Sequence, residues 1–355
     1  MTHRVEVPTA NLRNIDQFEK EPSAAIISEI KQHIKDTGNP CSWWGHSHTA
    51  PPSQALVVYL DDFDVPAPRG VRAVAPCPCC SPFHAKYKNG GKIAWFPHEK
   101  VIRLIGPFCF AAINAEGHEG AMRDLKRRKK IRSEQDIIIS YLPRIVPMIK
   151  AMEETIPIAG DLDALMFRLN WAFDEHFRIR IARHVLDGVL KVSKTVDVPF
   201  VKPDGEIGRR KEETFETVAR IQGYAMIDRT GKATAQKLEK MCVGLKVIAE
   251  RLQSIGSVSD LSDVERQRFA VKLPECRGHL SQILEELSRR QLFLTSGDLQ
   301  KLDEWGRDNG SPVSIEWTRQ KNQILMKDRR GADAPHVIAI GSQATAKLAG
   351  RLLEG

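Results

Sequence analysis

The sequence predicts an α+β protein, in which a small module with a β-hairpin precedes a mainly α-helical region and a small α+β C-terminal part. Three observations lead to this prediction: cysteines clustered ahead of two apolar β-type runs, apolar residues recurring at three- and four-residue steps through the middle of the chain, and short strand-like runs after residue 311. A length of 355 residues allows two or three compact units with cores of their own.

Composition places the chain among soluble globular proteins. Apolar residues make up 42% and charged residues 28% of the sequence, so general disorder is excluded. The longest apolar runs are shorter than the roughly 20 residues that cross a bilayer, and we expect no membrane span. The first residues lack a basic start that leads into an apolar stretch, so we expect a cytoplasmic protein.

Changes in pattern along the chain predict six segments. They are an N-terminal wrapping or linker segment with one helix and one strand (1–70), a cysteine-rich module that ends in a basic helix (71–132), a helical region (133–194), a hairpin or connector (195–232), a second helical region (233–310) and a small α+β tail (311–355). In the first helical region Pro143, Pro147 and Pro157 each lack a backbone donor, which predicts kinks or helix ends.

The cysteine-rich module contains the predicted β-hairpin. Two apolar arms, Ile93–Phe96 and Val101–Ile105, flank a short Pro-His-Glu-Lys turn. Three of the seven cysteines precede this hairpin within four positions, in the run "PCPCC" at 76–80. Because clustered cysteines in a reducing compartment are more often metal ligands or redox groups than disulfides, a metal site is the first interpretation.

The cysteine spacing points to zinc. Cys77 and Cys80 form a C-x2-C pair, which supplies two donors from one tight turn, and Cys109 and His118 lie beyond the hairpin. We predict a structural zinc ion held by Cys77, Cys80, Cys109 and His118, because so small a module needs more than hydrophobic burial to be stable. A knuckle, a hairpin and a ligand at a helix start resemble the plan of a treble-clef zinc module.

The fourth zinc ligand is open between His118 and three alternatives, His84, His98 and Cys79. Burial of these cysteines as small apolar side chains is the alternative to a metal site. A catalytic zinc is disfavoured: "PCPCC" matches the P-C-x-x-C half of zinc-dependent nucleobase deaminases, but the H-x-E that such enzymes need upstream is missing.

A second candidate metal group precedes the module. His46 and His48 are alternate residues, which share a face on an extended segment, and Cys41 lies nearby. The favoured interpretation of this stretch is a surface loop anchored by Trp43 and Trp44.

Positive charge is concentrated directly after the predicted zinc module. The segment 121–132 carries seven basic residues against one acidic residue, a net +6 in a chain whose total is +8. Such a helix neutralises phosphates readily, so we predict that it contacts the backbone of DNA or RNA without reading sequence. A solvated charged helix is the alternative. The predicted phosphate-binding residues are Arg123, Lys126, Arg127, Arg128, Lys129, Lys130 and Arg132.

The leading hypothesis is therefore a zinc-stabilised nucleic-acid-binding protein, one component of a larger assembly. The alternative is a zinc-stabilised adaptor whose helical regions bind protein partners. A zinc-dependent hydrolase or nuclease is a weaker alternative, because no nucleotide-binding, nucleophile-elbow or metalloprotease motif is present in the sequence.

Overall fold

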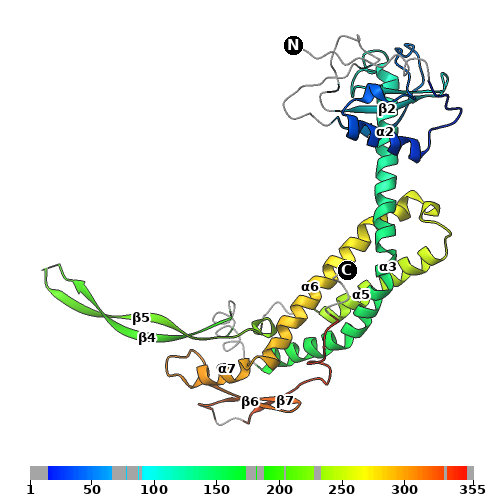
Figure 1. Ribbon diagram of the computed structural model, residues 1–355. Coiled ribbons are helices and arrows are strands. Elements are labelled where there is room, and N and C mark those ends of the chain that lie inside the picture. Colours follow the sequence, from blue (N-terminus) through cyan, green and yellow to red (C-terminus); the bar gives the residue numbers. More distant parts are fainter. Residues whose placement is uncertain are drawn as a thin grey trace. The chain divides into compact units, whose positions relative to one another are not determined.

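The computed structural model describes residues 15–65, 77, 87, 90–172, 181, 188–203, 205–227, 233–331 and 334–349. The chain divides into two compact units, Met1–Ser133 and Glu134–Gly355, which we call the N-terminal and the C-terminal unit. Within the described ranges, five α-helices accompany three small antiparallel sheets (Figure 1). The predicted α+β class is confirmed.

The N-terminal unit is built on a three-stranded sheet of order β1-β2-β3. Its strands and helices are α2 (Ala24–Thr37), the 3-10 turn η1 (Pro40–Ser42), β1 (Val58–Phe63), β2 (Gly91–Phe96), β3 (Val101–Ile105) and the start of α3 (Ala115–Ala172). The hairpin β2–β3 has the predicted arms, and Lys100 closes its turn with a positive φ of 55° and an N–H bond to the Pro97 carbonyl.

The core of this unit covers both faces of the sheet. Ile30 and Ile34 of α2 are fully buried, as are Ile93 of β2 and Ile102 of β3. Leu125 of α3 belongs to the same cluster, so the basic segment begins on a helix that is anchored to this core. Strands buried on both faces read as continuous apolar runs, which is why the two arms were recognisable in the sequence.

Helix α3 runs without interruption through the three prolines that were predicted to kink or end it. Each proline removes a single hydrogen bond, whereas the helix buries one face between them, including Ile145, Met148 and Met152, none more than 4% exposed. Burial of this face outweighs the lost bonds, so the helix does not end at any of the three prolines. The other form of the prediction, a local kink, stays a prediction.

The C-terminal unit combines helices with a three-stranded sheet of order β6-β7-β8. Its further elements are α5 (Thr234–Gln253), α6 (Asp263–Thr295), α7 (Asp298–Arg307), β6 (Ile315–Gln320), β7 (Gln323–Asp328) and β8 (His336–Ala339). Helix α6 starts at a capping box between Ser262 and Glu265. No helix in the described part of the chain has the length and apolar content of a membrane span.

A long two-stranded hairpin, β4 (Val189–Val201) and β5 (Ile207–Arg220), extends from the C-terminal unit (Figure 1). Its base is fixed: Leu190 and Val192 are fully buried, Trp305 of α7 donates to the Lys191 carbonyl at 2.8 Å, and the Ser193 N–H donates to the Gly310 carbonyl at 2.8 Å. Most residues beyond this base are exposed.

Candidate metal centre

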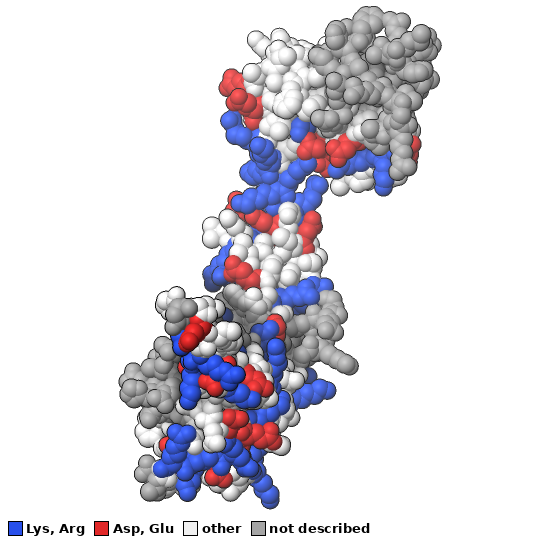
Figure 2. All heavy atoms as spheres, turned by 90° about the vertical axis from the view of Figure 1, so that its left-hand side faces the viewer, with Lys and Arg blue, Asp and Glu red and all other residues white. Residues whose placement is uncertain are grey.

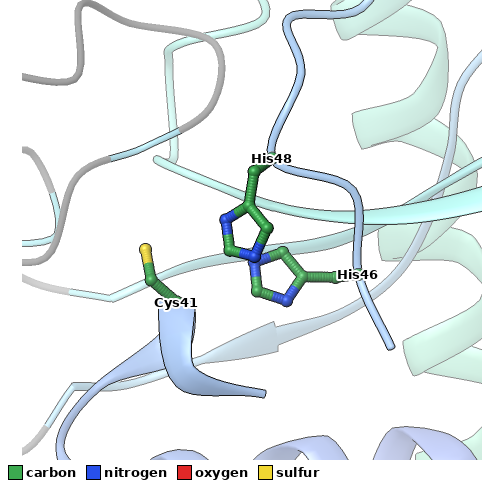
Figure 3. Close-up of side chains that lie close together, drawn as sticks. All are labelled: Cys41, His46 and His48. Atoms are coloured by element: carbon green, nitrogen blue, oxygen red, sulfur yellow. The ribbon is translucent and has the colours of Figure 1, made fainter. Parts of the chain in front are cut away.

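Three metal-ligating side chains of the N-terminal unit meet in one buried place (Figure 3). Cys41 Sγ and one ring nitrogen from each of His46 and His48 all lie within 4.8 Å of one another. Cys41 is 1% exposed and His46 is fully buried. This buried group can hold a metal ion.

Cys41 is positioned by the chain that leaves α2. Gly38 ends the helix with a positive φ of 64°, and the side chain of Asn39 accepts the Cys41 N–H at 3.1 Å, which starts the turn η1. Ser42 is held to α2 by a 2.8 Å contact with His33 Nε2. The turn therefore has one conformation, with the Cys41 thiol directed inward.

The segment His46–His48 is fixed along β3. The Ser47 N–H donates to the Ile102 carbonyl at 2.8 Å, and His46 forms a parallel bridge with Ile102. Just beyond, the buried Arg103 donates through Nε to the Thr49 carbonyl at 2.8 Å and pairs with Glu99 at 2.7 Å. Since alternate residues of an extended segment share a face, pinning Ser47 and Thr49 to β3 brings the two imidazoles together.

The hydrogen bond of His46 leaves its second nitrogen available for a metal. Nδ1 lies 2.6 Å from the Trp43 carbonyl, which only accepts, so Nδ1 carries the proton and Nε2 keeps its lone pair. Metal-binding histidines are commonly oriented in this way. Nε2 of His46 and Nε2 of His48 are both buried, and neither has a hydrogen-bond partner within the described part of the chain. Two buried ring nitrogens without a partner are costly, and a metal cation would satisfy both of them.

The two imidazoles are also neutral. Their ring centroids are 4.0 Å apart, and burial together with the neighbouring His48 lowers the pKa of His46 to about 3. Burial also lowers the pKa of His48. Neutral imidazole is the form that binds metal ions, and with a sulfur ligand it makes a donor set of the kind that zinc prefers.

This group corrects the interpretation of residues 41–48 as a surface loop, because Cys41, Trp43, His46 and Ser47 are all at most 2% exposed. Trp43 and His46 stack with ring planes at 12°, and the Trp43 indole donates to Glu29 at 3.0 Å. The alternation of His46 and His48 was the signal in the sequence. This alternation alone did not predict a buried metal group, because the contact with β3 that buries the segment joins residues that are far apart along the chain.

Three of the four predicted zinc ligands, Cys77, Cys109 and His118, lie in the described residues. Cys77 is 1% exposed and its Sγ accepts the Gly106 N–H at 3.2 Å, while the Cys109 N–H donates to the Gly106 carbonyl. His118 Nδ1 shares a 2.7 Å hydrogen bond with the Tyr59 hydroxyl. Cys80 lies outside the described residues, so this four-ligand site stays a prediction.

Of the three alternatives for the fourth zinc ligand, the structure describes His98 alone. His98 is exposed in the turn between β2 and β3, while Cys79 and His84 lie outside the described residues. Across the ranges that the structure describes, the group of three or more candidate ligands that comes together is Cys41, His46 and His48.

The basic segment is partly neutralised by the unit itself. Lys129 pairs with Asp61 at 2.9 Å and with Asp62 at 2.6 Å. Arg128 pairs with Asp124 at 2.8 Å and also donates to the Tyr59 carbonyl of β1. These two side chains hold α3 against β1, which differs from their predicted role as phosphate ligands.

The remaining cations lie on another face of the helix. Arg123, Lys126, Arg127 and Lys130 follow i, i+3, i+4, i+7 spacing and are all exposed, and Arg127 pairs with Asp124 at 2.9 Å. We call these four residues the α3 basic face. The face drawn in Figure 2 carries many blue side chains, with red ones among them. Arg132 is exposed two residues after Lys130, off this face.

Asp61 gives a pH test of the α3–β1 contact. Burial alone would raise its pKa, but hydrogen bonds from Lys31 at 2.7 Å and from Lys129 lower the pKa to about 2. The carboxylate therefore contributes stability above its unfolded pKa of roughly 3.9, and this is lost as pH falls toward about 2.

We expect Asp61→Asn to lower the free energy of unfolding of the N-terminal unit by about 1 kcal/mol at pH 7, after screening by solvent. Urea denaturation at several pH values should show this difference shrinking below about pH 4. Asp64→Asn, at an exposed position in the same segment, is the control. A difference that stays constant with pH would contradict this account.

The chain was compared with models of protein families, with curated proteins and with solved structures, and none of them matches it.

Proposed function

We propose that this protein binds nucleic acid through the α3 basic face and that a structural zinc ion stabilises its N-terminal unit. One observation carries the first part: of the seven cations of the basic segment, four are exposed together on one side of a helix that is anchored to a packed core. Cations presented on a rigid element bind phosphates with little loss of conformational entropy.

The choice of zinc follows from the donors. Cys41, His46 and His48 offer one sulfur and two nitrogens in a place closed to water, and zinc is the metal that such mixed sites hold most often. The burial of the three ligands also favours a structural role for the ion, because a catalytic ion needs a coordination position that substrate can reach. The ion would connect the turn after α2 to the segment that lines β3.

Binding to labelled DNA and RNA over a range of salt concentrations tests the nucleic-acid proposal. Changing Arg123, Lys126, Arg127 and Lys130 together to glutamine should weaken binding roughly tenfold or more and lower the slope of log affinity against log salt by about 3. The matched control changes four exposed cations of the C-terminal unit to glutamine: Lys237, Lys240, Arg268 and Lys321.

The control has the same net charge as the first variant, so it separates a local surface from general attraction. Equal losses in the two variants would overturn the assignment to α3. Absence of salt-dependent binding in the unchanged protein would overturn the nucleic-acid proposal altogether.

An adaptor that binds other proteins is the second candidate. It is favoured by Ile139, Leu142 and Val146 of α3, which lie at i, i+3, i+7 and are 52%, 41% and 62% exposed. An apolar stripe of this spacing is typical of a helix that packs against a partner. Failure of nucleic-acid binding would leave this candidate ahead.

A further inference from the structure

We infer that Cys77 is the fourth ligand of the metal centre, which makes it a closed site of two thiolates and two imidazoles with Cys41, His46 and His48. The inference rests on the proposed zinc ion and is independent of the proposed nucleic-acid binding. It also assigns Cys77, which the sequence placed with Cys80, Cys109 and His118, to a different set of ligands.

Structural zinc is almost always held by four protein ligands in a tetrahedron. Cys41, His46 and His48 supply three of them. We expect the missing ligand to come from the same region, because Cys41, Nε2 of His46 and Nε2 of His48 are all buried. A thiol is the best candidate, since two sulfurs and two nitrogens form a common structural zinc site.

Cys77 lies in the right direction along β3. The bridge between His46 and Ile102 is parallel, so the chain from His46 to His48 runs toward the same end of β3 as Gly106. Gly106 directly follows β3 and donates its N–H to Cys77 Sγ at 3.2 Å. The Cys77 sulfur is therefore held at the Gly106 end of β3. The chain from His46 to His48 runs toward this same end.

The surroundings of Cys77 are those of a ligating thiolate. The side chain is 1% exposed and belongs to the same core cluster as Cys41. A backbone N–H directed at a cysteine sulfur stabilises the negative charge that a thiolate ligand carries.

Cys77 Sγ is not part of the 4.8 Å group formed by the other three ligands. Zinc binding would draw it inward, to a zinc–sulfur distance of about 2.3 Å. Cys109 is the described thiol that competes most directly, because its N–H bonds to the carbonyl of Gly106, but its side chain is only half-buried. Cys79 and Cys80 lie outside the described residues, and the experiment below includes them.

Cobalt(II) replaces zinc in such sites, and its near-ultraviolet charge-transfer absorption reports the number of thiolate ligands. In the wild-type protein we expect one metal ion per chain, with two thiolate ligands. Cys77→Ser and Cys41→Ser should each remove about half of this absorption and weaken metal binding at least tenfold. Cys79→Ser, Cys80→Ser and Cys109→Ser should leave both quantities unchanged.

Two further measurements keep the test decisive if a serine variant fails to fold. X-ray absorption of the unchanged zinc protein should show two sulfurs at about 2.3 Å and two nitrogens at about 2.0–2.1 Å. Cys77→His should retain one metal ion with one sulfur fewer.

A two-thiolate spectrum in Cys77→Ser, or loss of a thiolate in Cys79→Ser, Cys80→Ser or Cys109→Ser, would overturn the assignment. Unchanged protein without bound metal would overturn both the zinc ion and this inference. The salt-dependent binding assay on the same samples reports on nucleic-acid binding separately.

Discussion

Removal of the metal is expected to unfold the N-terminal unit while the C-terminal unit stays folded. The two units have separate cores, and the metal group lies wholly within the first. Structural zinc contributes about 10–16 kcal/mol of apparent binding free energy in small zinc-finger peptides. Here the sheet and α2 add a hydrophobic core, so we expect a smaller loss, of at least about 3 kcal/mol.

Differential scanning calorimetry with and without a strong chelator measures this effect. For a unit of 133 residues a loss of about 3 kcal/mol lowers the melting temperature by roughly 10 °C. The transition of residues 134–355 should not move, and added zinc should restore the first transition. His46→Ala should reproduce the effect of the chelator, whereas His98→Ala, at the exposed hairpin turn, should not. Identical melting curves with and without chelator would contradict a structural ion.

Asp298→Ala is expected to destabilise the C-terminal unit by roughly 3–5 kcal/mol. The Asp298 side chain is fully buried in the first turn of α7, where one carboxylate oxygen accepts the Gln222 N–H at 2.9 Å and the Gly223 N–H at 2.6 Å. Alanine would leave two backbone donors without an acceptor at the base of the β4–β5 hairpin. Gly223 cannot move away easily, because its backbone lies against Phe293.

Asp298→Asn is the matched control for this prediction. Both backbone donors share a single carboxylate oxygen, and the amide oxygen of asparagine can take its place. The loss should then be about 1–2 kcal/mol, the part that depends on the negative charge. Urea denaturation compares the two variants. Equal losses for alanine and asparagine would show that charge, and not the two hydrogen bonds, accounts for the effect.

Local patterns in the sequence predicted much of the fold. The β2–β3 hairpin was evident because its arms are buried on both faces and a four-residue turn separates them. The capping box at Ser262 marked the start of α6 for a similar reason, since all of its hydrogen bonds lie within one helical turn. The prolines of α3 do not end the helix, because the compensating burial comes from packing between helices, which is not visible locally.

The sites depended on contacts between distant segments. Lys129 was predicted to bind phosphate, but Asp62, 67 residues earlier, pairs with it across the α3–β1 contact. The metal group was partly visible as His46 and His48, yet only their position along β3 showed that this stretch is buried beside Cys41. No pattern in the sequence encodes such a register.

The β4–β5 hairpin has a practical consequence for engineering. The bonds that attach it to the C-terminal unit in the described residues lie near its base, where Leu190 and Val192 are buried and Trp305, Gly310 and Lys301 bond to its backbone. At the opposite end, a side chain added at Gly205 would meet no atom within 4 Å, although the positive φ of 84° there favours glycine. Insertions are tolerated best where the backbone is exposed and makes few contacts. A peptide tag or a fluorescent label is therefore best accommodated at this tip.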